Sequence, residues 1–425
     1  MAVELHIYQS FRAMPATQAE LAPTLTTAPR SALSVRTCSS WDELDRFREQ
    51  WNRLLGGNPA ASIFQTPEWL ASWWQAYGRN RSFLALVFED LAGDVVGIVP
   101  FYSDQTSFLG FALKTLRMVG AGSGDSDGLD IITAPGCESD CAKAFIAWFA
   151  GQKEWQLCAL ETLPDHSLTA ESLLRETQKS GISLDRTLIP NFIINLPPTW
   201  PEYLGSLEPS FRPLLTRYPK RLRSRFTVKF SRCEDQGDLN SQLDKLFDLH
   251  QMRWTGRGET GAFASNERRD FYYRMATAFL QRGWLEFWRL ELNGETVGAQ
   301  FCFRYNDTVS LLQEGFHPKY AAEKIGYALK AQLLEEIIRT GARRYDFLGG
   351  ADPYKSKFGA HQENYLNLFI AGPSKLARLY LQVQKQKREI KAWLKHKLPA
   401  ALVAALSDHA TSRAAEPSRQ NFQSE

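Results

Sequence analysis

The feature that most constrains the fold is an internal repeat at an offset of about 200 residues. The stretch "FQTPE" at 64–68 returns as "FASNE" at 263–267, 199 residues later. Each has a phenylalanine, then a hydroxyl residue suited to cap a helix, Thr66 or Ser265, and then a glutamate. The turn "GDVVG" at 93–97 returns as "GETVG" at 294–298, 201 residues later. Features that recur in one order at nearly one offset indicate duplication of a whole domain.

Hydrophobic periodicity predicts the same order of elements in both halves: two helices, a β-hairpin, a glycine-bearing loop, a helix and an apolar strand. In the first half, "TPEWLASWWQAYG" has Thr66 as a helix N-cap and Pro67 at the first helical position. The turn at 92–94 joins two apolar strands. We therefore predict an α+β fold of layered α/β type, with two tandem domains, each a mixed β-sheet flanked by helices.

Length and composition agree with a globular protein of two or three domains. The chain has 425 residues, 44% of them hydrophobic and 23% charged, and its net charge of +3 does not by itself indicate nucleic-acid binding. We expect ordinary reduced thiols and no metal site, because the six cysteines form no CxxC pair. No secretory segment or apolar run of about 20 residues is visible, so we expect a cytoplasmic protein.

Composition also suggests five segments. We predict a disordered tail at 1–31, an N-terminal domain at 32–198, a C-terminal domain at 199–372, a basic amphipathic helix at 373–406 and a disordered tail at 407–425.

The order of elements resembles the GNAT acyltransferase fold. The stretches "GFHPKYAAEKIGYAL" (315–329) and "YDFLGGADPYKSKFG" (345–359) are similar to the CelD-type acetyltransferase family, a GNAT branch named for cellulose biosynthesis. They also resemble Fem-type peptidyltransferases, which carry two GNAT copies. "WDELDRFREQW" and "DVVGIVPFY" fit the same family, so the resemblance covers roughly residues 35–370. It implies two tandem GNAT-like domains, with acetyl-CoA or another acyl-CoA as the donor.

The resemblance places the donor pyrophosphate at the N-terminus of the helix after the central strand, where free N–H groups and the helix dipole attract anions. The family pattern is Gln or Arg, two residues, Gly, one residue, then Gly or Ala. Here Gly326 and Ala328 fit, but Glu323 replaces the first residue and is expected to repel phosphate, while Lys319 and Lys324 restore positive charge. Alternatively, Gly326 only permits close packing. The predicted donor contacts are Gln313, Gly315, Lys324, Gly326, Tyr327, Lys355 and Lys357.

The stretch 345–359 differs from its first-half counterpart when Pro164 is aligned with Pro353. The first half, "ALETLPDHS", lacks the double glycine and the lysines. Gly349 and Gly350 allow close approach of a ligand to the backbone. The alternative is a solvated loop with ordinary lysines.

Three residues are candidate catalysts. Asp346 lies within a strand, where burial would raise its pKa and suit it to act as a base; alternatively it caps a turn or pairs with Arg343 or Arg344. Tyr354 is a candidate acid for the leaving thiolate, as in many GNAT enzymes, or simply packs. Glu314 is a second candidate base, and the backbone N–H groups around 313–315 are placed to polarise the carbonyl.

We expect the acceptor to lie between the two copies. Asp125, Asp127 and Asp130, on the loop "GSGDSDGLD", suit sugar hydroxyls or an amine, or else only form turns. His250, Arg253 and Trp254 stand where the apolar face of a predicted helix ends; the alternative for His250 is a surface or hydrogen-bonded position.

Two basic runs have open roles. Residues 211–232 carry eight Lys or Arg and no acid, so they form either a patch for a polyanion such as tRNA or a glycan carrier, or a solvated helix face. The run 375–398 either contacts a membrane surface or packs on the core and solvent.

The favoured function is therefore an N-acetyltransferase, or another acyl-CoA-dependent acyltransferase, acting on an amino sugar, a polysaccharide precursor or a similar small acceptor in exopolysaccharide or cellulose biosynthesis. Two alternatives remain: a Fem-type transferase that uses aminoacyl-tRNA, which alone would involve nucleic acid, and a non-catalytic scaffold of a polysaccharide system.

Overall fold

The computed structural model describes residues 33–255, 261–350, 352 and 354–397, so both predicted tails lie outside the described residues. The first half contains these elements: β1 (Ser34–Cys38), α1 (Trp41–Asp45), α2 (Arg48–Gly56), α3 (Pro67–Tyr77), β2 (Ser82–Glu89), β3 (Val95–Phe108), β4 (Phe111–Met118), β5 (Ile132–Thr133), α4 (Glu138–Ala150), β6 (Leu157–Pro164), α5 (Leu168–Lys179) and β7 (Leu184–Asn195).

The second half repeats this order after two added helices. Its elements are α6 (Trp200–Ser206), α7 (Arg212–Arg225), β8 (Val228–Arg232), α8 (Gln236–Thr255), α9 (Asn266–Arg282), β9 (Leu285–Leu292), β10 (Glu295–Tyr305), β11 (Thr308–Phe316), α10 (Ile325–Arg339), β12 (Arg344–Gly349), α11 (Tyr354–Lys357), β13 (His361–Ala371) and α12 (Lys375–Lys397).

The caps expected from the repeat are confirmed. The Thr66 hydroxyl accepts a hydrogen bond from the Trp69 N–H at the start of α3, and the Ser265 hydroxyl accepts one from the Arg268 N–H at the start of α9. A side-chain oxygen at the N-cap satisfies a backbone donor that the helix leaves unpaired. The two helices therefore begin at equivalent positions for the same physical reason.

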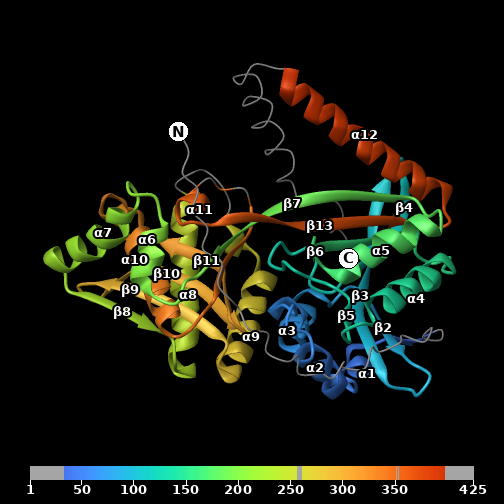
Figure 1. The fold of residues 1–425 in the computed structure, drawn as a ribbon, viewed down its shortest axis with the longest axis horizontal. Helices are drawn as coiled ribbons and strands as arrows, with labels where there is room; N and C mark the ends of the chain where they lie inside the picture. The colour runs from blue at the N-terminus through green and yellow to red at the C-terminus, as the bar shows by residue number, and fades with distance from the viewer. Residues whose placement is uncertain (1–32, 256–260, 351, 353, 398–425) are drawn as a thin grey trace, which may run out of the picture. The chain divides into compact units, whose positions relative to one another are not determined.

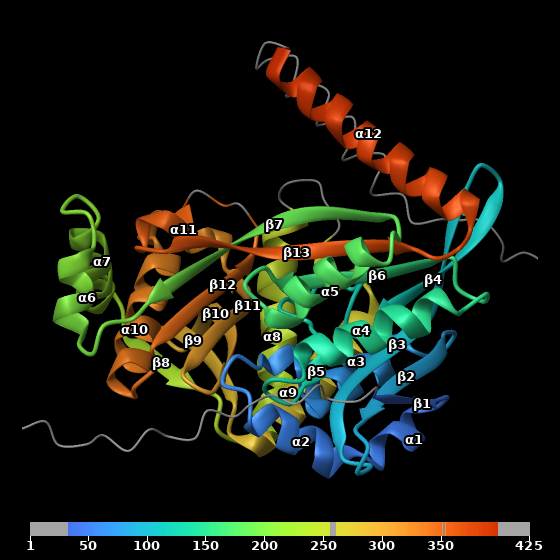
Figure 2. The same ribbon diagram turned by 45° about the vertical axis from the view of Figure 1, so that its right-hand side comes forward.

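One mixed sheet runs through both halves. Its strand order is β1-β2-β3-β4-β6-β13-β7-β12-β11-β10-β9-β8, with β5 paired to β3. The last strand of the second half, β13, pairs with β6 of the first half, while β7 of the first half pairs with β12 of the second. Figures 1 and 2 show β7 and β13 running side by side between the two groups of elements. Each half therefore completes the sheet of the other.

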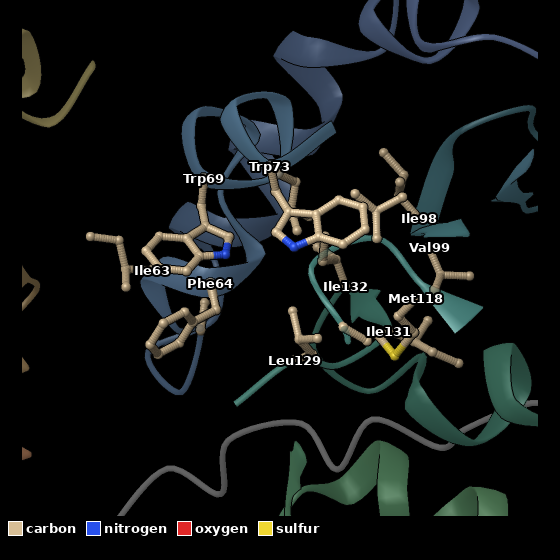
Figure 3. Packing of buried hydrophobic residues seen from close by; sticks show 14 of the residues in the cluster. Ile63, Phe64, Trp69, Trp73, Ile98, Val99, Met118, Leu129, Ile131 and Ile132 are labelled. Carbon is tan, nitrogen blue, oxygen red and sulfur yellow. The ribbon is translucent and has the colours of Figure 1, made fainter. Parts of the chain in front are cut away.

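The main hydrophobic core is shared between the halves. Helix α3 packs against α9, and the Trp69 ring lies 5.1 Å from Phe271 and 5.6 Å from Phe303. Figure 3 shows Trp69 and Trp73 among the buried aliphatic side chains of the first half. A second core lies beneath α6, α7 and α10. Each large apolar side chain that is fully buried stabilises the folded state by roughly 1.5–3 kcal/mol. The two halves therefore gain stability from a common interior.

In each half, the two parallel central strands pair over only three residues. β11 pairs with β12 from Thr308 to Ser310 opposite Arg344 to Asp346, and β4 pairs with β6 from Thr115 to Arg117 opposite Leu157 to Ala159. Beyond these residues the parallel pairing stops in both halves. This gap in the hydrogen-bond ladder lies beside the candidate site.

A strained residue follows the paired part of each strand. Thr162 has φ of 58° and Leu348 has φ of 59°, both in the left-handed region that L-residues rarely adopt. Both lie at register shifts, and they are 186 residues apart. Aligning Pro164 with Pro353, 189 residues later, therefore differs from the structure by two or three residues at this strand. The residue equivalent to Asp346 in the first half is Ala159 by the parallel pairing and Leu160 by the left-handed residues, and neither has a titratable group.

Candidate active site

Asp346 lies in the middle of β12 and is held by strands from both halves. It is the last residue of β12 paired to β11, and only 7% of its surface is exposed. One of its carboxylate oxygens accepts a hydrogen bond from the Leu348 N–H at 2.7 Å, and the other from the Tyr365 hydroxyl at 3.4 Å. The Asn191 amide in turn donates to the Tyr365 oxygen at 3.0 Å. Strands β7, β12 and β13 thus fix the orientation of this carboxyl group.

Burial raises the pKa of Asp346 to about 7, and the nearby Asp127 carboxyl adds to the shift. The Leu348 N–H opposes the shift, because it stabilises the carboxylate. Arg344 does not bond to Asp346, since its guanidinium pairs with Glu363 at 3.0 Å. The buried position and raised pKa expected for Asp346 are confirmed, while its role as a base stays a prediction.

Asp346 lines a cavity of about 170 Å³ at the junction of the two halves. Ser62, Phe64, Asp127, His166 and Asn191 of the first half line it, together with Ser310, Arg344, Asp346, Glu363 and Tyr365 of the second. Carboxylates outnumber cations among these residues, and the guanidinium of Arg344 is already paired with Glu363. The cavity therefore favours a cationic ligand.

Asp127 connects the first-half loop to the end of β12. Its carboxylate accepts a hydrogen bond from the Gly349 N–H at 2.8 Å. A Cβ added at Gly349 would lie 3.3 Å from this carboxylate, so glycine allows the close approach. Burial raises the pKa of Asp127, and the Gly349 N–H opposes this. The structure thus brings Asp127 and Asp346, two residues predicted separately, to one cavity.

Asp125 lies elsewhere. Its carboxylate pairs with the guanidinium of Arg268 on α9 and accepts a hydrogen bond from the Tyr272 hydroxyl at 3.2 Å. Burial raises the pKa of Asp125, and the Arg268 charge opposes the rise. The residue is 2% exposed and does not line the cavity. This ion pair joins the two halves, and a contact of Asp125 with substrate stays a prediction.

Lys355 closes the loop that follows β12. Its ammonium group donates hydrogen bonds to the carbonyl oxygens of Leu348, Gly349 and Gly350 at 3.1, 3.3 and 2.9 Å. The side chain is buried, and desolvation lowers its pKa. An ammonium group has three donors, so all three are used within the loop. This geometry suits Lys355 to position the loop after β12 better than to contact phosphate as predicted. Lys357 is exposed, and its contact with the donor stays a prediction.

The buried Lys330 pairs with the partly buried Glu314, and neither residue lines the cavity. The Lys330 ammonium lies 3.0 Å from the Glu314 carboxylate, which also accepts a hydrogen bond from the Gln300 amide at 2.8 Å. Four aromatic rings surround the ammonium at 4.9–5.9 Å, those of Tyr345, Phe347, Tyr354 and Phe358. The sequence analysis did not predict Lys330. The feature that could have indicated it is a lysine among the apolar residues of "YALKAQLLEEII".

Tyr354 belongs to this aromatic group. Its ring meets those of Phe347 and Phe358 edge-on at 6.1 and 6.4 Å. The aromatic packing weighed as its alternative role is therefore present. A proton-donating role for Tyr354 stays a prediction.

The start of α10 is compatible with an anionic donor. Its first turn contains no acidic residue, whereas the first turn of α4 in the first half contains Glu138 and Asp140. Lys324, the residue before α10, is exposed and has φ of 53°. A helix N-terminus that lacks acidic residues attracts phosphate. Of the two equivalent helices, only α10 has this character.

Glu323 is not positioned to repel phosphate as expected. It is 8% exposed, and its carboxylate pairs with Arg225 at 2.5 Å and with Arg221 at 3.4 Å, both on α7. The basic run 211–232 therefore supplies two arginines that balance this charge. Since α7 precedes the predicted motif by about 100 residues, no local pattern indicated the pairing.

The remaining predicted donor contacts pack closely against neighbouring elements. A Cβ at Gly326 would lie 3.2 Å from the Phe316 ring, and one at Gly315 would lie 2.8 Å from Leu249 on α8. Tyr327 contacts the rings of Tyr218 and Phe358. Both glycines thus permit helices to approach β11, which is the packing role weighed for Gly326. Gln313 lies on β11, partly buried, and its contact with a donor stays a prediction.

His250 is buried on α8 with its ring 5.0 Å from Phe263, and it does not line the cavity. The side chains of Arg253 and Trp254 lie outside the described residues. All six cysteines are free and buried. Among the residues that the structure describes, no group of three or more His, Cys, Asp or Glu side chains could hold a metal ion.

Comparison with known proteins agrees with this architecture. Residues 209–356 match the family model of the acetyltransferase (GNAT) domain. FemX is similar in structure, with a TM-score of 0.53 and 10% identity over 79% of this chain and 96% of that one. A conserved protein of unknown function from Bacteroides thetaiotaomicron VPI-5482 has a TM-score of 0.50 and 11% identity, over 76% of this chain and 97% of that one. No curated protein matches the sequence.

A tandem GNAT protein from the clavulanic acid biosynthesis pathway is less similar, with a TM-score of 0.45 and 13% identity over 80% of this chain and 100% of that one. At these identities the likenesses to FemX and to the Bacteroides thetaiotaomicron protein concern the fold alone. The matched domain contains α10 and β12 and ends within α11. It therefore includes Asp346 and Lys355 but not the first-half residues that complete the cavity.

Proposed function

We propose that the protein is an acyltransferase of the GNAT superfamily, and that it transfers an acyl group from an acyl-CoA to a small amine held in the cavity between its halves. The observation that carries this proposal is the position of Asp346, a buried carboxyl group with a pKa of about 7, in the wall of that cavity. An amine enters as a cation and must lose a proton before it can attack. A base whose pKa lies near neutrality is suited to accept that proton.

The donor fits the second half of the molecule. The α10 N-terminus and Lys324 would hold its phosphates, and the paired Glu323 leaves no free carboxylate beside them. The bound acyl-CoA supplies the activated acyl group. β11 and β12 are unpaired beyond Ser310 and Asp346, whereas residues 313–315 of β11 still pair with β10. The backbone N–H groups at 313–315 that face away from β10 would polarise the acyl carbonyl.

The acceptor chemistry follows from the cavity walls. Asp127 and Asp346 provide negative charge for an ammonium group, and Asn191 and Ser310 add polar surface. We favour an amino sugar or similar polysaccharide precursor, acetylated from acetyl-CoA in the cytoplasm, because the segments 315–329 and 345–359 are similar to the CelD-type family.

A Fem-type transferase that uses aminoacyl-tRNA is the second candidate. The exposed side chains of Arg217, Lys220 and Arg223 on α7 favour it, because they could contact a polyanion. Retention of tRNA at low salt, lost in a variant with all three changed to Gln, would support it. The scaffold alternative rested on repulsion between Glu323 and the phosphates of the donor. Because Arg221 and Arg225 neutralise Glu323, this argument no longer supports it.

Thermal unfolding with added acetyl-CoA and with free CoA tests the donor. A ligand that binds only the native state stabilises it by roughly 2.7 kcal/mol at about 100 times its Kd. We expect a saturable rise in Tm with both compounds. In a separate activity assay, adding amines to the protein and acetyl-CoA should release the free thiol of CoA. No rise in Tm at any accessible concentration would contradict the proposal.

A further inference from the structure

Helix α12 is attached to the sheet by only one of its faces. Ala377 and Leu381 are buried in a small core with residues of β3, β4, β6 and β13. The Phe108 ring lies 5.3 Å from Tyr380, and Arg388 pairs with Asp185 on β7. Figures 1 and 2 show that the helix then leaves the sheet and projects beyond it.

A second apolar face of α12 is exposed. Leu379, Ile390, Trp393 and Leu394 expose 43, 58, 59 and 39% of their surface. At about 100° per residue these four side chains fall within an arc of about 100°. Ala377 and Leu381 lie on the opposite side of the helix. We call the exposed set the α12 stripe.

The charges on α12 are almost all positive. Between 375 and 394 the helix carries six basic residues and one acid, Glu389, and the arginine at 388 is engaged with Asp185. Lys387 and Lys391 are exposed and flank one edge of the α12 stripe. Two copies of the helix brought together would set like charges against each other. An anionic surface matches both the charge and the apolar stripe.

The neighbouring β3–β4 hairpin adds to this surface. Leu109 and Phe111 at its tip are 68 and 63% exposed. They flank the turn next to Phe108, the residue that meets Tyr380 at the base of α12. Large apolar side chains thus gather at the hairpin tip and along α12.

We propose that α12 docks the protein on the surface of an anionic phospholipid bilayer. The stripe would enter the boundary between headgroups and acyl chains, while Lys387 and Lys391 stay at the level of the phosphates. This is peripheral binding: no described helix is both long and apolar enough to cross a bilayer. The proposal concerns a helix that contributes no residue to the lining of the acyl-transfer cavity, and it does not depend on the proposed acceptor.

Co-sedimentation of the full-length protein with vesicles tests the proposal. We expect binding to phosphatidylcholine vesicles that contain phosphatidylserine, weak binding to phosphatidylcholine alone, and loss of most binding when salt rises from about 0.1 M to about 1 M. Ile390→Glu and the double variant Lys387→Glu/Lys391→Glu should each weaken binding at least about tenfold. Leu91→Glu, at an exposed turn in the β2–β3 hairpin, is the matched control and should bind as the wild type does.

Three results would overturn the proposal. One is equal binding by the wild type and the Ile390→Glu variant; another is equal binding to charged and uncharged vesicles. The third is a dimer in analytical ultracentrifugation that Ile390→Glu dissociates while vesicle binding is absent, which would make the α12 stripe an interface between copies. Circular dichroism of each variant verifies that the helix is retained.

Discussion

At the scale of single residues, the buried carboxyl group of Asp346 makes stability depend on pH. Its pKa is raised from 3.8 to about 7 in the native state, so between these values the native state holds a proton that the unfolded state has lost. The free energy of unfolding therefore falls as pH rises through this window and is lowest above about pH 7. The stabilisation that the protonated form contributes is complete below about pH 3.8 and is lost as pH rises through about 7.

Asp346→Asn should remove this dependence. Near pH 8 we expect the variant to be more stable than the wild type by roughly 2–4 kcal/mol, with the difference shrinking toward pH 4. Urea unfolding at about pH 5 and about pH 8 measures both values. If the difference in stability between Asp346→Asn and the wild type is the same at both pH values, the carboxyl group of Asp346 has an ordinary pKa.

At the scale of elements, the loop after β12 is held by Lys355. Replacing Lys355 with Met keeps the apolar stem but removes three hydrogen bonds to the carbonyl groups of 348–350. We expect kcat to fall by about tenfold to a hundredfold, because the bulge that carries Asp346 shifts. KM for the acyl-CoA should stay unchanged, and the exposed Lys357→Met is the matched control. A raised KM with normal kcat would instead indicate direct contact with the donor.

The local elements could be predicted from the sequence, because caps, turns and hydrophobic periodicity act over a few residues. Thr66, Ser265 and the strand containing Asp346 are examples. Contacts between distant segments could not. The pairing of Glu323 with α7, of Asp125 with Arg268 and of β13 with β6 each joins residues about 100 or more positions apart. No periodicity encodes such partners, so a predicted ligand and an internal ion pair look alike in sequence.

At the scale of the whole molecule, the exchange of β7 and β13 makes the halves interdependent. Either half alone would leave unpaired strand edges and an open hydrophobic core. We therefore expect one cooperative unfolding transition, with fluorescence and circular dichroism changing together. Two separated transitions would show that the predicted domains 32–198 and 199–372 fold independently.

The dependence of acyl transfer on pH tests the central claim most directly. For the wild type, kcat/KM should rise with pH and level off above about pH 7, as Asp346 ionises. Asp346→Asn should lower kcat/KM by about a hundredfold or more. It should also abolish the rise of kcat/KM with pH below about 7. Asp130→Asn is the matched control, since burial raises the pKa of Asp130 also to about 7 but it does not line the cavity. The account would be contradicted if the rise of kcat/KM with pH were unchanged in Asp346→Asn. It would also be contradicted if this rise were lost in Asp130→Asn alone.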